Sequence, residues 1–172
     1  YHHHGIWIGH GEVNGYDFWL EHPNRTGRIE QHFVEEIVAR GARVGFRVRN
    51  RWVAPDGRVP LVDVRSFWFT FDEAGDLVID LTVSLWPMGG PVTLFGSNEA
   101  GIPHVRPARG IWVVNGGRIV NSAGGVNEAG TYGKEAEWVD YSGPVGPGGT
   151  WYGIAVFIPV FPATVGGCPV QV

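Results

Sequence analysis

The chain of 172 residues contains one cysteine and one lysine, and charged residues make up only 17% of it. Cys168 alone can form neither an intrachain disulfide nor a cysteine metal cluster. The longest apolar run, residues 153–161, is far shorter than the ~20 residues of a membrane-spanning helix and is interrupted by Pro159. The formal net charge is −4 and the arginines are scattered, which argues against nucleic-acid binding. We therefore expect a soluble chain with neither membrane nor nucleic acid as a partner, and the oligomeric state stays open.

Glycine and proline, in contrast, are abundant at 27 and 12 residues, and they form no repeat or low-complexity tract. This composition indicates many tight turns. Apolar and other residues alternate with period two through residues 42–53, 59–71 and 77–86, and turn residues lie between these runs. The pattern predicts an antiparallel meander. We expect an all-β fold, an antiparallel β-sandwich alone or within a supersandwich, with long functional loops and a single domain over residues 1–172.

Other segments are less definite. Residues 28–40 fit a helix, because Ile29, Phe33 and Ile37 recur at four-residue spacing, and they fit a strand equally well. A hairpin is predicted from residues 111–114 and 118–122, a short strand at 92–95, and further strands at 135–142 and 150–159. The stripe at Arg47–Arg51 is interpreted as a solvated sheet face, with a polyanion-binding stripe as the alternative.

Four of the seven histidines lie within the first ten residues. In an extended strand, His2 and His4 would be about 6–7 Å apart, and a pair at that spacing can share a zinc, iron or manganese ion. His4 and His10 would be roughly 20 Å apart, too far to bind one ion. We therefore predict at most one divalent metal ion, held by His2 or His3, with His10 as a further ligand if the strand bends.

His10 lies between two glycines and is followed by Glu12, Asn14 and Asp17. An imidazole beside a carboxylate is suited to proton transfer, because it titrates near neutral pH and the carboxylate can fix its tautomer. The alternative is structural: Asn14 and Gly15 simply form the turn of a hairpin.

Residues 2–19 and 121–143 together resemble the PmoA-like family, which is labelled methane oxygenase. The similar stretches are HHHGIWIGHGEVNGYDFW and NSAGGVNEAGTYGKEAEWVDYSG. The chain differs from the family pattern at His4, Glu12 and Tyr132, and it is shorter than typical members, so we expect it to be truncated. The resemblance implies a β-sandwich protein from a family associated with bacterial carbohydrate catabolism, in the cytoplasm or secreted.

The function predicted from these residues is acid–base chemistry on a sugar or glycoside, by hydrolysis, elimination or epimerisation. The substrate would be a small molecule or an oligosaccharide, and Lys134 would stabilise developing negative charge unless it forms a surface salt bridge to Glu137. A non-catalytic carbohydrate- or protein-binding sandwich is the alternative, and a metal-dependent oxidoreductase is a second one. The predicted catalytic residues are His10, Glu12, Lys134 and Asp140, and the predicted substrate-binding residues are Asn14, Asp17, Trp19, Trp138 and Tyr141.

Overall fold

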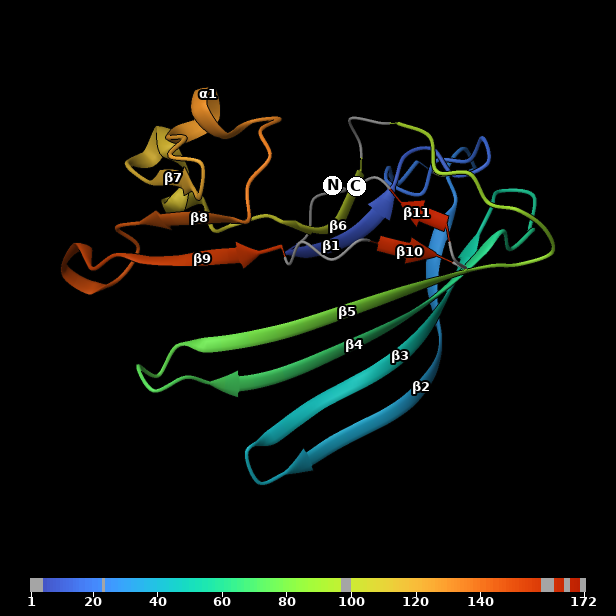
Figure 1. Cartoon of the computed structure of the whole chain (residues 1–172), viewed down its shortest axis with the longest axis horizontal. Coiled ribbons are helices and arrows are strands. Elements are labelled where there is room, and N and C mark those ends of the chain that lie inside the picture. The colour runs from blue at the N-terminus through green and yellow to red at the C-terminus, as the bar shows by residue number, and fades with distance from the viewer. Residues whose placement is uncertain (1–4, 23, 97–99, 159–162, 166–167, 171–172) are drawn as a thin grey trace. The chain divides into compact units, whose positions relative to one another are not determined.

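The computed structural model describes residues 5–22, 24–96, 100–158, 163–165 and 168–170. The chain divides into two compact units, Tyr1–His104 and Val105–Val172, which are described separately (Figure 1). Strands predominate and the sheets are antiparallel, which confirms the predicted all-β, sandwich-like fold class. The prediction of a single domain stays a prediction. None of the helices among these residues is long and apolar enough to cross a membrane.

A four-stranded antiparallel meander with the order β2-β3-β4-β5 dominates the first unit, and β1 pairs with β6 in a small second sheet. The meander predicted over residues 42–86 is therefore confirmed, and β2 adds a fourth strand to it. The strands are β1 (Ile6–His10), β2 (Arg28–Arg40), β3 (Arg43–Val53), β4 (Leu61–Phe71), β5 (Leu77–Pro87) and β6 (Ala100–Val105). The predicted strand at 92–95 is reduced to an isolated bridge between Leu94 and Val13.

Two β-bulges settle the ambiguity of residues 28–40 in favour of a strand. The register of β2 against β3 shifts between Gln31 and Phe33 and again between Val34 and Glu36. Each bulge inserts one residue and so interrupts the alternation. As a result, Ile29, Val34 and Ile37 all fall on one face of the sheet, at spacings of five and three residues. Phe33, opposite Arg49, falls on the other face, so the four-residue spacing of Ile29, Phe33 and Ile37 does not mark one face of this segment.

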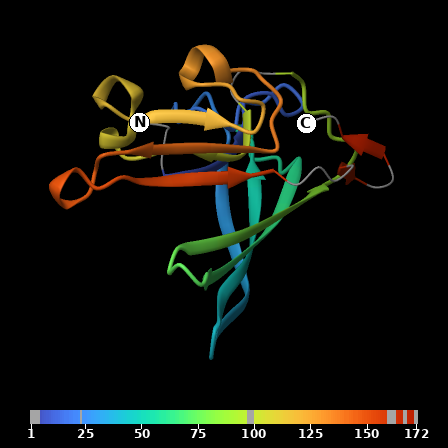
Figure 2. The same ribbon diagram turned by 60° about the vertical axis from the view of Figure 1, so that its left-hand side comes forward.

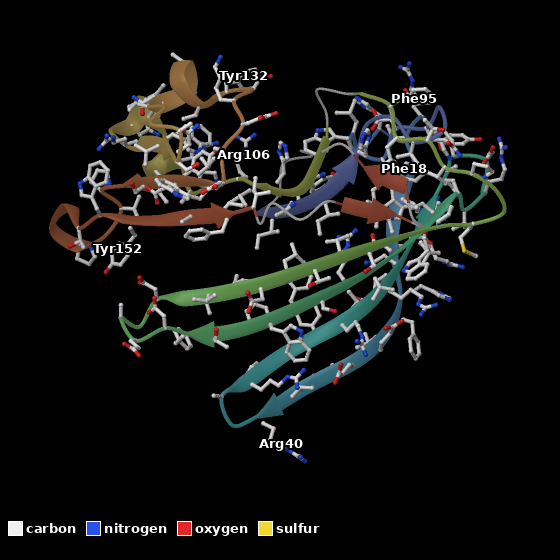
Figure 3. The ribbon with its side chains drawn as sticks, viewed as in Figure 1. Phe18, Arg40, Phe95, Arg106, Tyr132 and Tyr152 are labelled. Carbon is white, nitrogen blue, oxygen red and sulfur yellow. The ribbon has the colours of Figure 1, made fainter. Side chains whose placement is uncertain are left out.

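The core of the first unit lies at one end of the meander. Trp52 and Leu61 are buried there against Ile8, Val13 and Phe18 from β1 and the loop that follows it. Figure 3 shows Phe18 at this end and Arg40 at the far tip of the β2–β3 hairpin. The sheet twists along its length (Figure 2), and β3 and β4 stay paired up to Val44 and Phe69 near the tips. Apolar side chains of the far half are exposed, as at Ile37 with 75%.

The arginine stripe lies on the face of the meander that is opposite the face carrying Trp52. Arg47 and Arg49 both pair with Glu35, and Arg51 pairs with Glu30. These arginine side chains are 43–50% exposed. The stripe is thus a solvated face, as predicted, and the structure adds that glutamates of β2 neutralise its charges.

The second unit is a three-stranded antiparallel sheet with the order β7-β8-β9, and β10 pairs with β11. Its elements are β7 (Arg118–Asn121), α1 (Asn127–Thr131), β8 (Trp138–Gly143), β9 (Tyr152–Phe157), β10 (Ala163–Val165), β11 (Cys168–Val170) and three short 3-10 helices: η1 (Arg109–Ile111), η2 (Val113–Asn115) and η3 (Pro147–Gly149). The predicted strand at 111–114 is wrong, because η1 and η2 occupy this segment. Gly117 packs so tightly on the Ile111 backbone that a side chain there would clash.

Candidate functional site

His10 ends β1, and its ring is held by the loop that follows. The backbone N–H of Glu12 donates a hydrogen bond of 3.1 Å to His10 Nδ1. Burial lowers the pKa of His10 from 6.5, and the Glu12 carboxylate partly offsets this effect. The ring is therefore neutral at neutral pH and carries its proton on Nε2. In this state His10 can donate a hydrogen bond at Nε2, but it can accept neither a proton nor a metal ion there.

Asn14 and Gly15 form the turn of a short hairpin, which confirms the structural alternative for this segment. Both have positive φ, 51° and 84°, as a type I′ turn requires. The Asn14 carboxamide is also occupied: Oδ1 accepts a hydrogen bond from the Thr93 N–H at 2.7 Å, and Nδ2 donates to Pro91 O at 3.1 Å. These contacts fasten the loop to residues 91–93. A substrate-binding role for Asn14 stays a prediction.

Asp17 and Trp19 have structural contacts as well. Asp17 Oδ1 accepts hydrogen bonds from the backbone N–H groups of Trp19 and Leu20, at 2.6 and 3.0 Å. The Trp19 ring is only 2% exposed and packs edge-on against Trp7 and His104, with centroids 6.0 and 4.7 Å apart. A ring so deeply buried offers no open face to a ligand in this structure, and the substrate-binding role of Trp19 stays a prediction.

The metal prediction cannot be followed to its ligands, because His2 and His3 lie outside the described residues. Within the described ranges, no three His, Cys, Asp or Glu side chains gather in an arrangement that could hold a metal ion. The divalent metal stays a prediction, and the hydrogen bond at His10 Nδ1 argues against His10 as its ligand.

In the second unit, strand alternation separates the predicted residues of β8. Trp138 and Asp140 lie on one face, and Tyr141 lies on the other. The face that carries Trp138, here called the Trp138 face, consists of Arg118, Val120, Trp138, Asp140, Ser142, Gly153, Ala155 and Phe157. Tyr141 lies near Glu128, and its pKa is raised by burial first and then by the Glu128 charge.

Aromatic and polar groups stand side by side on the Trp138 face. Trp138 is directly opposite Phe157, which is 72% exposed. Asp140 Oδ2 accepts a hydrogen bond from Ser142 Oγ at 2.9 Å. Arg118 lies opposite Ser142, is exposed and forms no ion pair with a described residue. The face therefore offers two rings, a carboxylate oxygen and a guanidinium to the same neighbourhood.

Lys134 lies between α1 and β8 and is exposed. Its backbone N–H donates to Thr131 O at 3.2 Å, whereas its ammonium group forms no ion pair with any described residue. The alternative of a salt bridge to Glu137 is therefore not seen. Lys134 and His10 belong to different compact units, so the convergence of the two motifs in one pocket stays a prediction.

Three polar residues that sequence reasoning missed lie on the face of the meander that carries Trp52, where most residues of β3, β4 and β5 are apolar. They are Asn50, Asp63 and Arg65, and they hydrogen-bond to one another through the Asp63 carboxylate. A signal for them exists in the sequence: each occupies a position where the period-two alternation calls for an apolar residue. Such departures from the binary pattern are expected at functional or strained sites.

Taken together, the chain is an all-β protein of two compact antiparallel units, with polar clusters on both main sheets. The family model that matches residues 1–159 is described as "Family of unknown function (DUF6807)", and the chain belongs to this family. The resemblance to the PmoA-like family is thereby corrected, because the comparisons give no indication of that family. No curated protein and no solved structure matches the chain.

Proposed function

We propose that the protein binds carbohydrate through the Trp138 face of its second unit. The observation that supports this most directly is that Trp138 and Phe157 are opposite each other in the register of β8 and β9, on the face that also carries Asp140. Aromatic rings pack against the apolar C–H faces of sugars, while a few convergent polar groups fix the orientation of the hydroxyls. Asp140 and Arg118 supply an acceptor and donors for this purpose.

Binding fits the geometry better than catalysis does. In the first unit, the Asn14 and Asp17 side chains are engaged with the backbone, and Trp19 is buried. In the second unit, Arg118 and Phe157 of the Trp138 face are exposed, and Asp140 is partly exposed. This arrangement is suited to recognising a chain of sugars along the strands.

The test is calorimetric titration of the full chain with a panel of neutral oligosaccharides. We expect at least one to bind, and Trp138→Ala and Asp140→Asn each to weaken it about tenfold. Tyr132→Ala is the matched control, because Tyr132 is 81% exposed and follows α1, outside the sheet (Figure 3). It should change the affinity less than twofold. Absence of binding to the whole panel, or equal effects of the three substitutions, would refute the proposal.

The predicted acid–base chemistry on a sugar is the second candidate, with His10 as a hydrogen-bond donor from Nε2 to a substrate oxygen and not as the proton acceptor. A half-buried imidazole whose Nε2 proton is fixed by a hydrogen bond at Nδ1 can polarise a substrate oxygen. Incubation with the bound oligosaccharide should then release product, and His10→Ala should abolish the release. His32→Ala, which alters an exposed histidine of β2, should not. Binding without product release would leave the protein a pure binding module.

A further inference from the structure

We propose that the apolar face of the meander carries a binding site for a carboxylate with an apolar body, recognised by Arg65. This face is here called the Arg65 face, and on β3 to β5 its polar residues are Asn50, Asp63 and Arg65. On β3 to β5 it consists of Val44, Phe46, Val48, Asn50, Trp52, Leu61, Asp63, Arg65, Phe67, Phe69, Phe71, Leu77, Ile79, Leu81, Val83, Leu85 and Pro87. The site is distinct from the Trp138 face, which lies in the other unit.

The Asp63 carboxylate is the anchor of the site. It is fully buried, and both of its oxygens accept hydrogen bonds from neighbouring side chains. Asn50 Nδ2 donates to Oδ1 at 2.6 Å, and Trp52 Nε1 donates to Oδ2 at 2.7 Å. These contacts hold the carboxylate in one orientation, so it can fix a cation in turn.

Arg65 is the cation that Asp63 fixes. Its Nε donates to Oδ1 at 2.9 Å and its Nη2 donates to Oδ2 at 2.7 Å, which is the two-point contact of an arginine with a carboxylate. A guanidinium has five N–H groups, and this contact uses two of them. The remaining three have no hydrogen-bond partner among the described residues.

The surroundings of Arg65 are apolar and partly open. Val48 and Val83 lie opposite it on the neighbouring strands, and Phe67 follows on the same face, stacked on Phe46 at 5.0 Å between centroids. The Arg65 side chain is 16% exposed, against 50% for Arg49 on the solvated face. Nη1 of Arg65 has no partner among the described residues and is not buried, so a ligand can reach it beside these apolar side chains.

A carboxylate is the acceptor that matches best, because a guanidinium offers paired, parallel donors. Towards the hairpin tips, the same face exposes Val44 and Ile79 by 44% and 37%. These side chains can cover the apolar body of the ligand. A purely structural role explains less, since replacing a buried ion pair by apolar residues is often neutral or stabilising.

The test compares octanoate with octanol, which have the same chain and different head groups, by calorimetric titration. The unmodified protein should bind octanoate at least about tenfold more tightly than octanol. The double variant Asp63→Leu with Arg65→Leu replaces the pair with apolar side chains and should bind the two equally. The matched control is Glu35→Leu with Arg49→Leu, which removes an ion pair on the opposite face and should keep the preference.

Arg65→Lys provides a second variant should the double variant fail to fold. It keeps the charge but loses the two-point geometry, so the preference for octanoate should fall several-fold. Equal binding of octanoate and octanol by the unmodified protein would overturn the proposal. A preference that persists in the double variant would overturn it too, as would a dimer in light scattering that the double variant abolishes.

Discussion

Replacing Trp52 by phenylalanine should destabilise the first unit far more than its modest change in shape suggests. Trp52 is fully buried, and its Nε1 donates to Asp63 Oδ2 at 2.7 Å. Phenylalanine keeps a ring beside Phe18, whose centroid lies 5.2 Å away, but it removes the N–H. The carboxylate then loses one of its hydrogen bonds in a place that water does not reach.

The expected loss has two parts. A hydrogen bond to a charged group contributes about 1.5–3 kcal/mol, and the smaller ring buries less apolar surface, which costs roughly 1 kcal/mol more. We therefore expect the free energy of unfolding to fall by roughly 2–4 kcal/mol. Since domains are stable by about 5–15 kcal/mol, a large share of the stability is at stake.

Urea unfolding followed by circular dichroism measures this loss. The two compact units can unfold in separate transitions, so the transition that shifts identifies the first unit. Trp86→Phe is the control, because Trp86 is 58% exposed and should lose less than about 0.5 kcal/mol. A double-mutant cycle with Asp63→Asn should show a coupling of about 1 kcal/mol or more. Equal effects at Trp52 and Trp86, or no coupling, would refute this account of the core.

Two further predictions concern single positions. A methyl group at Gly45 would clash with the Phe67 carbonyl oxygen and the Trp68 ring, so Gly45→Ala should lower the free energy of unfolding in urea by about 1–3 kcal/mol. The control is Gly5→Ala, which should be nearly neutral because a methyl group there meets nothing within 4 Å. Equal losses would contradict the packing of β3 on β4. Burial keeps the pKa of His10 in the folded chain below 6.5, its ordinary value in the unfolded chain. On acidification His10 is therefore protonated first in the unfolded chain, so the free energy of unfolding falls as the pH drops below 6.5. His10→Gln should flatten that part of the pH dependence, and an NMR titration that placed the His10 pKa above 6.5 would refute it.

Much of the fold follows from the sequence where alternation is undisturbed. Strands β3, β4 and β5 pair without an inserted residue, so the period of two is kept along each strand and the meander could be predicted almost to its ends, although Asn50, Asp63 and Arg65 interrupt the apolar face. Strand β2 could not be predicted with the same certainty, because its two bulges interrupt the period-two alternation on which a strand is recognised. The segment before β7 could not either, since β-prone residues such as Val113 form 3-10 turns where Gly117 allows close backbone packing.

The candidate site could be predicted only in part, for a related reason. Sequence proximity groups Trp138, Asp140 and Tyr141, whereas the pleat of β8 turns Tyr141 to the other face. Spacing likewise cannot reveal that the Asn14 side chain reaches residues 91 and 93, far along the chain. Asp63 and Arg65 were detectable as polar residues in apolar positions, but which atoms they engage depends on the pairing of β3 with β4.

The two bulges also decide where the meander can accept another strand. β2 and β5 are its two edges, and an edge strand with free N–H and C=O groups is a template for foreign chains. Along β2, the inserted residues and the charges of Glu30, Glu35 and Glu36 hinder the pairing of another strand with this edge. β5 pairs with β4 in unbroken register over all its 11 residues and contains no bulge. Lateral growth of the sheet is thus obstructed on one flank, and any association by strand addition would begin at β5.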